Sequence, residues 1–463
     1  MNLETNNKNL EKGITLVIPN PCGNIKETKM KNSDVEWIGE IPEDWEVKKV
    51  KHSFVRKNEK AMQENPIVLS LARSGVRERD ISNNEGQLAE SYYNYNPVDV
   101  DDLLINPMDL YSGANCSISK VKGVISSAYI NLRAKKNVSP VFYDYYFKVQ
   151  YWMMAFFAHG NGVSFENRWT LNNETLQNYP IVAPSFETQQ RIASYLDKKC
   201  NKIEETIQNQ QQVIENLKAY KQSLITEAVT GKIKIQNGKV CGEYESYKDS
   251  GVEYLAAIPS NWKVKRLRYI GKCQNGISKG GEFFGSGYPF VSYGDVYNNL
   301  TLPETVAGLI ESTPEEQENY SVKTGDIFFT RTSETIEEVG FTSVCLKTIK
   351  NATFAGFVIR VRPFTDELLP GFSKYYFSSD AHRRFFVKEM NLVTRASLSQ
   401  ELLKRLPVLL PSKEEQKSIA DYLDKKCIAI DNAIEQKQNL IEKLTEYKKS
   451  LIYECVTGKK EVN

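Results

Sequence analysis

The sequence predicts an α+β fold in which two globular units alternate with two long helices that form a coiled coil. Three observations support this fold class: a long segment that occurs twice, a heptad pattern of aliphatic residues inside both copies, and short strand-like runs between the copies. The chain has 463 residues, which is too long for one ordinary domain, so several units are expected.

The repeated segment is nearly identical in its opening phrase. "PSFETQQRIASYLDKKC" begins at Pro184, and "PSKEEQKSIADYLDKKC" begins at Pro411. When 184–232 is aligned with 411–459 at a constant offset of 227, 28 of the 49 positions are identical without a gap. Roughly three identities are expected by chance from average composition. The chain therefore contains an internal duplication, and both copies end on Thr-Gly-Lys.

Each copy of the repeat is predicted to form one long helix. Pro-Ser opens it, acidic residues occupy the first turn, and Gly231 or Gly458 closes it. Aliphatic residues recur at the a and d positions of a heptad, the pattern of a two-helix coiled coil. The predicted seam residues are Leu196, Ile203, Ile207, Ile214, Leu217, Leu224, Leu423, Ile430, Ile434, Ile441, Leu444 and Leu451. Two further seam positions are polar in both copies, Gln210/Lys437 and Lys221/Lys448, and they either fix the register or lie exposed at a frayed seam.

The duplication continues outside the helices. "VEWIGEIPEDWEVKKV" (35–50) matches "VEYLAAIPSNWKVKRL" (252–267), and "RWTLNNETLQNYPIVAPS" (168–185) matches "RASLSQELLKRLPVLLPS" (395–412). Between these stretches the two sequences diverge, and the offset drifts from 217 to 227, so the second globular unit is about ten residues longer. We therefore expect the frames of the two halves to repeat while their globular interiors differ.

The predicted order along the chain is arm, globular unit, helix, linker, globular unit, helix. The boundaries are an N-terminal arm at 1–33, a first globular unit at 34–183, a first helix at 184–232, a hairpin and linker at 233–250, a second globular unit at 251–410 and a second helix at 411–463. In the linker, Asn237-Gly238 is a strong hairpin turn. The aromatic-rich segments 141–157 and 371–386 favour amphipathic core helices, although the interleaved basic residues leave stacking on nucleic-acid bases open.

Composition and missing motifs argue against a catalytic chain. The eight cysteines include no Cys-x-x-Cys pair, and the three histidines are His52, His159 and His382, so we expect no metal site and interpret His159 and His382 as ordinary surface or core residues. No G-x4-G-K-[ST] phosphate loop occurs. "NPMDLY" (106–111) lacks the second proline and the base-stacking aromatic residue of an amino-methyltransferase motif. A chain without a cofactor of its own is expected.

The compartment follows from hydropathy and from the polar N-terminus. No apolar run reaches 18 residues, and "MNLETNNKNLEKG" does not resemble a signal peptide, so a cytoplasmic protein without a membrane span is expected. The formal net charge of +2 leaves nucleic-acid binding undecided, because a local basic face can occur on a balanced chain.

Recognition of DNA is the function that the remaining polar loop residues favour. Arginine suits bidentate contact with guanine, and hydroxyl groups suit contact with phosphate. The candidate DNA-binding residues are Arg73, Ser74, Arg77, Arg79, Asn161 and Arg168 in the first globular unit and Tyr293, Asp295, Arg331, Thr332 and Arg395 in the second. For each of them, solvated surface or an internal ion pair is the alternative.

From about residue 33 to 460, the chain resembles the DNA-specificity subunit of type I restriction–modification systems. The resemblance is carried by the duplicated helices ending in Thr-Gly-Lys, by the Ile-Pro-x-x-Trp entry of each globular unit, and by "QQRIASYLDKKC", "GEIPEDWEVKKV" and "SLITEAVTGK". It implies two target-recognition domains, each reading half of a bipartite DNA site, and two helices that pair antiparallel as a spacer. The implied partners are double-stranded DNA, two modification subunits that use S-adenosylmethionine to methylate adenine, and restriction subunits that use ATP and Mg.

Two other classes of function are alternatives to this one. One is a self-contained methyltransferase or nuclease, which the missing motifs disfavour. The other is a non-catalytic scaffold with two partner-binding domains on a coiled-coil spacer. DNA binding that weakens steeply with salt separates the specificity subunit from the scaffold, because phosphate contacts release counterions.

The resemblance predicts that helix length sets the gap between the two half-sites. Deleting one heptad from both helices is expected to shorten the spacer of the methylated DNA motif. Modified-base sequencing of DNA from cells that express the shortened chain with its modification subunit measures that spacer. An unchanged motif would show that the helices do not act as a ruler.

Overall fold

The computed structural model describes residues 29–82, 89, 91–108, 110–111, 115–162, 169–255, 257–333, 338–389 and 396–462. The chain forms two compact units. The first unit contains the residues up to Thr206 together with the segment from Lys443 onward, and the second unit is Ile207–Glu442. Each unit therefore contains one globular part and a portion of both long helices.

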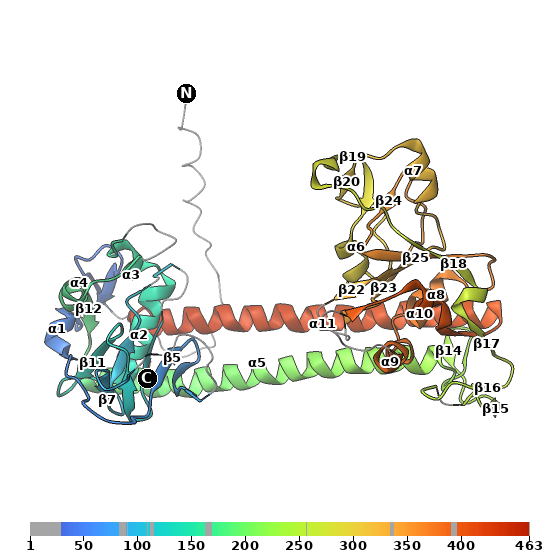
Figure 1. The fold of residues 1–463 in the computed structure, drawn as a ribbon. Helices are drawn as coiled ribbons and strands as arrows, with labels where there is room; N and C mark the ends of the chain where they lie inside the picture. The colour runs from blue at the N-terminus through green and yellow to red at the C-terminus, as the bar shows by residue number, and fades with distance from the viewer. Residues whose placement is uncertain are drawn as a thin grey trace. The chain divides into compact units, whose positions relative to one another are not determined.

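The two long helices are α5 (Phe186–Val229) and α11 (Lys413–Val456), drawn in green and red in Figure 1. Each has 44 residues, which corresponds to about 66 Å at 1.5 Å per residue. Ser185 and Ser412 cap them, because their hydroxyls accept hydrogen bonds from the amides of Thr188 and Glu415, both at 3.2 Å. Each helix ends two residues before its predicted closing glycine, and Gly458 takes a φ of +75° that a helix cannot contain. The last residues of the predicted segment 411–463 therefore lie beyond the helix.

Within each unit the beginning of one long helix packs against the end of the other. In the first unit Leu196 and Leu451 belong to one core, and in the second unit Leu224 and Leu423 do. The helices are therefore antiparallel in both units. The structure places all twelve predicted seam residues in buried or half-buried positions.

Ion pairs between the long helices repeat with the sequence. Lys221 Nζ lies 2.7 Å from the carboxylate of Asp431, and Lys448 forms the equivalent pair with Glu204. Both partners of one pair are related to those of the other by the offset of 227. These contacts favour a register role for Lys221 and Lys448 over a frayed seam, because a shifted register would separate both pairs.

A four-stranded antiparallel sheet lies in the globular part of each unit. In the first unit its order is β4 (Phe54–Lys57), β11 (Ile130–Ala134), β8 (Leu103–Ile105) and β9 (Cys116–Ile118). In the second unit the same order is built from β18 (Gly271–Asn275), β25 (Val358–Pro363), β21 (Ile327–Thr330) and β23 (Thr342–Val344). The two globular interiors, whose sequences diverge as expected, therefore share one central-sheet topology, since buried strands tolerate different apolar side chains.

The remaining elements of the first unit surround this sheet. They are β1 (Met30–Asn32), β2 (Glu40–Pro42), β3 (Glu46–Lys49), α1 (Val50–Ser53), β5 (Leu69–Ala72), β6 (Gly75–Glu78), β7 (Asn96–Val98), β10 (Gly123–Ile125), α2 (Pro140–Trp152), α3 (Ala155–Ala158), α4 (Asn173–Asn178) and β12 (Pro180–Ala183). The hairpin β5–β6 and the pair β7–β10 cover the small apolar cluster around Leu69, Leu71 and Leu104.

The second unit has a different outer part, which includes a three-stranded sheet of β20 (Leu309–Ile310), β19 (Phe284–Val291) and β24 (Thr353–Phe354). Its remaining elements are β13 (Ile235–Gln236), β14 (Lys239–Val240), β15 (Tyr247–Lys248), β16 (Ile258–Pro259), β17 (Lys263–Arg266), the 3-10 helices Leu267–Tyr269 and Gly281–Phe283, α6 (Tyr293–Tyr297), α7 (Pro314–Asn319), β22 (Thr332–Ser333), α8 (Pro370–Tyr376), α9 (Asp380–Glu389), β26 (Ala396–Ser397), α10 (Gln400–Arg405) and β27 (Pro407–Leu410). The predicted hairpin turn at Asn237-Gly238 joins β13 to β14, with φ values of +51° and +71°.

The aromatic-rich segments form core helices, as their periodicity predicted. In α2, Phe142, Tyr143, Tyr146 and Phe147 are fully buried, and in α8 Phe372 and Tyr376 are buried equally well. Trp152, at the end of α2, is the exception at 41% exposure. Most of these rings are therefore unavailable for stacking on bases.

Polar contacts tie each globular part to the start of the helix that follows it. The buried Gln189 accepts a hydrogen bond from the Ser139 amide at 2.8 Å, and Gln416 accepts one from the Leu369 amide at 2.8 Å. Tyr145 donates to Asp197 at 2.8 Å, and Tyr375 donates to Asp424 at 2.6 Å. Each contact in the first unit thus has its counterpart in the second.

The glycine that ends each helix lies against the Ile-Pro-x-x-Trp motif. A Cβ atom on Gly231 would lie closer than 3.0 Å to the Pro259 ring and 3.3 Å from Trp262. A Cβ atom on Gly458 would meet Pro42 and Trp45 in the same way, at 3.2 Å from the tryptophan. Both glycines have a positive φ, of +74° and +75°. Two motifs that repeat separately in the sequence are therefore one contact in the fold.

This contact predicts that Gly231→Ala and Gly458→Ala each destabilise their unit. The left-handed backbone costs about 1–2 kcal/mol for an alanine, and the clash with the proline ring adds to it. The matched controls are Gly251→Ala and Gly39→Ala, whose φ values are +70° and +69° and whose added Cβ meets nothing within 4 Å. Denaturant unfolding of the full chain measures the difference, and equal losses in test and control variants would refute the packing argument.

Candidate nucleic-acid interface

Two loops lie side by side at the same end of the central sheet in both units. In the first unit the segment 106–111, which follows β8, bonds with 169–171: Leu110 N donates to Trp169 O at 3.1 Å, and Leu171 N donates to Pro107 O at 2.8 Å. In the second unit the segment 331–333, which follows β21, pairs with 396–398, and Leu398 N donates to Arg331 O at 2.7 Å. We call these two places the paired-loop edges.

A buried aspartate fixes the start of the strand that leads to each edge. The Asp102 carboxylate accepts from the Asp99 amide and from Arg133 Nε, both at 2.8 Å. The Asp326 carboxylate accepts from the Lys323 amide and from Arg362 Nε, both at 2.7 Å. Sequence comparison missed this motif because only the aspartate and the arginine recur, at unequal spacing. The edges are thus held by a rigid scaffold, which positions recognition loops well.

The ion pairs around Asp102 form a small network with Asp99. Lys57 Nζ lies 3.0 Å from Asp99 and 2.9 Å from Asp102, and the guanidinium of Arg133 contacts both carboxylates. Hydrogen bonds from Arg133 and Lys57 lower the pKa of Asp99 to about 2. The Asp99 carboxylate therefore stays charged at physiological pH, and the network is structural because it holds the start of the strand.

In the first unit, Asn161 lies at the paired-loop edge. Its backbone exchanges two hydrogen bonds of 2.8 Å with Thr170, and its side chain is exposed. Arg168 falls outside the described residues. Arg73 and Ser74 form the exposed turn of the hairpin β5–β6.

The hairpin holds Arg77 and Arg79 as well. Arg77, which is exposed, pairs with Ser70 across the hairpin, on the opposite face from Leu71 and Val76. Arg79 is half-buried directly after β6. The hairpin lies along β9, because a Cβ on Gly75 would be 3.4 Å from Ser117. β9 is also the next strand after the first loop of the edge. The hairpin therefore packs beside the strand to which that loop leads.

In the second unit the structure brings three predicted residues together. The Tyr293 hydroxyl donates to the Thr332 carbonyl at 3.0 Å, and Arg331 precedes Thr332 at the edge. Burial raises the pKa of Tyr293, so its hydroxyl stays neutral and remains a donor. All three side chains are half-buried. Arg395 falls outside the described residues.

Asp295 has a different role from the one that its sequence position suggested. Its carboxylate accepts from the amide and the hydroxyl of Ser292 at 2.8 and 2.7 Å, and this closes a capping box at the start of α6. A carboxylate used in this way positions α6, which carries Tyr293.

The first edge also contains an aromatic residue that sequence reasoning missed. Tyr111 is 62% exposed, and its ring centroid lies 6.2 Å from that of Phe157, which is 5.7 Å from Trp169. Exposed rings beside polar residues suit stacking on bases. The sequence signal for this residue is the tyrosine that ends "NPMDLY".

No metal centre is found among the described residues, since no three His, Cys, Asp or Glu side chains gather there in a suitable cluster. His382 lies in the core against Phe386, and burial lowers its pKa to about 3. His159 packs on Trp37 with centroids 4.4 Å apart. In the part of the chain that the structure describes, no helix is long and apolar enough to cross a bilayer.

The model of the type I restriction modification DNA specificity domain matches this chain twice, at residues 42–216 and 259–446. The type I restriction enzyme EcoBI specificity subunit of Escherichia coli is 22% identical over 381 residues, covering 81% of this chain and 76% of that protein. The MjaVIII specificity subunit of Methanocaldococcus jannaschii is 25% identical over 372 residues, covering 77% and 80%.

Solved structures show the same fold. A chain from a study of "complex assembly and conformational transition of the type I R-M system" has a TM-score of 0.68 at 16% identity and covers 91% of this chain and 99% of its own length. The HsdS subunit of Thermoanaerobacter tengcongensis has a TM-score of 0.50 at 15% identity, with 91% and 98% coverage.

The family match confirms the predicted family and, with it, a non-catalytic role in DNA sequence recognition. Each matched region begins at the Ile-Pro-x-x-Trp motif of one half of the duplication and runs into the long helix that follows. The chain therefore belongs to the type I restriction–modification DNA-specificity family, with one specificity domain in each half of its internal repeat.

Proposed function

We propose that this chain reads a bipartite DNA site, one half with each paired-loop edge, and docks modification and restriction subunits that carry out the chemistry. The observation that carries the proposal is that one sheet topology presents two different sets of loop residues. The same strand order supports the loops of both edges in the same way. The different side chains on those loops would give the two edges different base preferences.

The residues at the two edges differ in hydrogen-bonding chemistry. The first has Asn161, Tyr111 and the nearby hairpin with Arg73 and Arg77. An asparagine amide matches the two hydrogen-bonding groups of adenine, and an arginine matches guanine. The second edge has Arg331, which supports contact with a guanine or a phosphate. A split, asymmetric target sequence is the expected result.

The surface proposed for the partner subunits is on the two long helices. Their outer faces are polar and exposed along most of α5 and α11, and in the second unit a hollow between the helices is lined by Gln208, Gln211, Gln212, Ile214, Glu215, Lys218, Gln438 and Ile441. We propose that two modification subunits bind these repeated faces, because one surface that occurs twice fits two copies of one partner. S-adenosylmethionine, ATP and Mg would be bound by the partners, and the complex would work in the cytoplasm.

Exchanging the first globular part tests the division into half-sites. Residues 34–183 replaced by those of a relative are expected to change one half of the methylated motif and leave the other half intact. The exchange must keep Ile41, Pro42 and Trp45, because these contact the helix ends. Modified-base sequencing reads the motif. A motif altered in both halves, or no chain-dependent methylation beside an active partner, contradicts the proposal and favours a scaffold.

Arg331→Ala tests the second edge directly. The backbone hydrogen bonds of Arg331 to Phe357 and Leu398 do not involve its side chain, so the fold is expected to remain. Loss of one base-contacting arginine weakens binding by about 1–3 kcal/mol and relaxes discrimination at one position. Binding of the assembled complex to duplexes mutated in either half-site measures this. Arg266→Ala, at an exposed position in β17, is the control and should leave both half-sites unaffected.

A further inference from the structure

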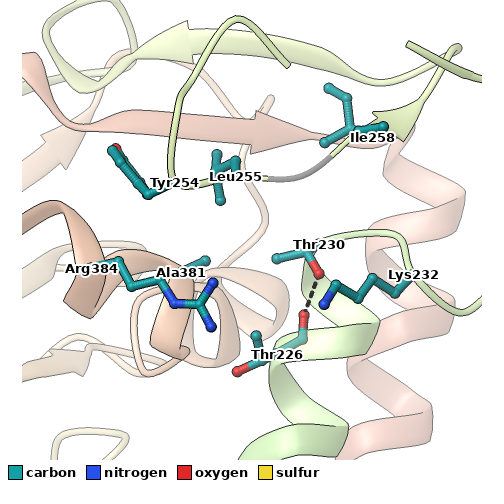
Figure 2. A pocket seen from close by; sticks show the side chains of 9 residues that line it. Thr226, Thr230, Lys232, Tyr254, Leu255, Ile258, Ala381 and Arg384 are labelled. Atoms are coloured by element: carbon teal, nitrogen blue, oxygen red, sulfur yellow. Dashed lines mark hydrogen bonds between the residues drawn. The ribbon is translucent and has the colours of Figure 1, made fainter. Parts of the chain in front are cut away.

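A hollow in the second unit lies between the end of α5, the helix α9 and the segment that leads into β16 (Figure 2). Its volume is about 40 Å³. One buried water needs roughly 10–15 Å³ measured in this way, so the hollow admits a group larger than a water. The paired-loop edge residues 331–333 and 396–398 are not among the side chains that line it.

Two cationic side chains enter this hollow from opposite sides. Figure 2 shows the ammonium group of Lys232 and the guanidinium group of Arg384 pointing toward one another across it. No ion pair or hydrogen bond of either cationic group occurs among the residues that the structure describes. The two positive charges repel each other, and an anion bound between them would attract both.

A hydroxyl group adds a third donor. Thr226 Oγ1 accepts from the Asp380 amide at 3.2 Å, which leaves its own hydrogen to donate into the hollow. The Thr230 hydroxyl instead donates to the Thr226 carbonyl at 2.6 Å, as the dashed line in Figure 2 shows. An oxyanion would thus meet an ammonium, a guanidinium and one hydroxyl.

The two nearby carboxylates have partners outside the hollow, although Asp380 lines an adjacent hollow together with Arg384. Asp380, at the start of α9, accepts a hydrogen bond from the Gln222 amide group at 2.8 Å. Glu253, in the segment that precedes β16, pairs with Lys388. Neither carboxylate is among the side chains that line the hollow.

The other half of the duplication shows the same lysine in a different setting. At the offset of 227, Lys232 corresponds to Lys459 and Thr226 corresponds to Tyr453. In the first unit the Lys459 ammonium lies 4.5 Å from the centroid of the Tyr453 ring and contacts its hydroxyl. In one half the tyrosine ring therefore covers the Lys459 ammonium. In the other half the smaller threonine leaves open space beside the Lys232 ammonium.

We propose that this hollow binds a phosphate group, supplied either by the DNA backbone or by free phosphate. Arginine and lysine are the side chains that proteins use for phosphate, and the tetrahedral oxygens can accept from donors on opposite walls. At the corresponding position of the other half, among the described residues, Lys459 lies on the Tyr453 ring instead. Binding of free phosphate to the hollow does not depend on the proposed DNA-reading function. A phosphate from the DNA backbone as the ligand does rest on that function.

Titration calorimetry of the full chain with inorganic phosphate, at constant ionic strength against chloride, tests the site. We expect saturable binding that weakens at least tenfold in Lys232→Ala and in Thr226→Tyr, which places the tyrosine of the other half into the hollow. Lys232 is exposed, so its removal should leave the fold intact. Lys459→Ala is the matched control and should bind phosphate as the unaltered chain does. Phosphate no more effective than chloride, or equal binding by all variants, overturns the proposal.

Duplex DNA then identifies the source of the phosphate. Each phosphate contact contributes about 0.9 to the slope of log affinity against log salt. If Lys232→Ala lowers that slope for the assembled complex by about this amount, a backbone phosphate occupies the hollow. An unchanged slope beside lost phosphate binding assigns the hollow to free phosphate. Failure of the unaltered complex to select a DNA sequence would refute the proposed function, while the phosphate titration would still judge the hollow.

Discussion

The contact between a helix-ending glycine and a Pro-x-x-Trp motif is the constraint on which the rest of this fold depends. Gly231 meets Pro259 and Trp262, and Gly458 meets Pro42 and Trp45, in each case too closely for any side chain at the glycine. The second contact joins the end of the chain to its first globular part, so the first unit is completed only by residues after Lys443. The antiparallel arrangement within each unit follows, because each globular core needs the start of one helix and the end of the other.

A fixed frame leaves the loops free to differ. The central sheets have the same strand order, and a buried aspartate paired with an arginine fixes the strand before each edge. Beyond that point the two units diverge: a hairpin with arginines accompanies the first edge, whereas α6 with Tyr293 supports the second. Scaffold stability and specificity are thus carried by different residues, so that specificity can change without loss of the fold.

Several features could be predicted from sequence because short-range patterns determine them. The heptads predicted the buried seam, Asn237-Gly238 predicted a tight hairpin, and the spacing of aromatic residues in α2 predicted a core helix. Asp295 was predicted to bind DNA, whereas its carboxylate caps α6 through Ser292, three residues earlier, a local pattern that the sequence already contained. Tyr111 was overlooked for a different reason, because its partner Phe157 is far away in sequence.

The sequence by itself determined that this chain is duplicated, has two long helices and resembles a specificity subunit, because the gapless alignment of 49 positions, 28 of them identical, and the heptad spacing are local features. Only the tertiary structure decided that the two repeated motifs touch, that the diverged interiors share one sheet, and which predicted residues meet at each edge. It also decided that Lys232 faces open space while its counterpart Lys459 covers a tyrosine ring. The physical reason is that packing, charge and hydrogen bonding act between side chains that the fold brings together, whatever their separation along the chain.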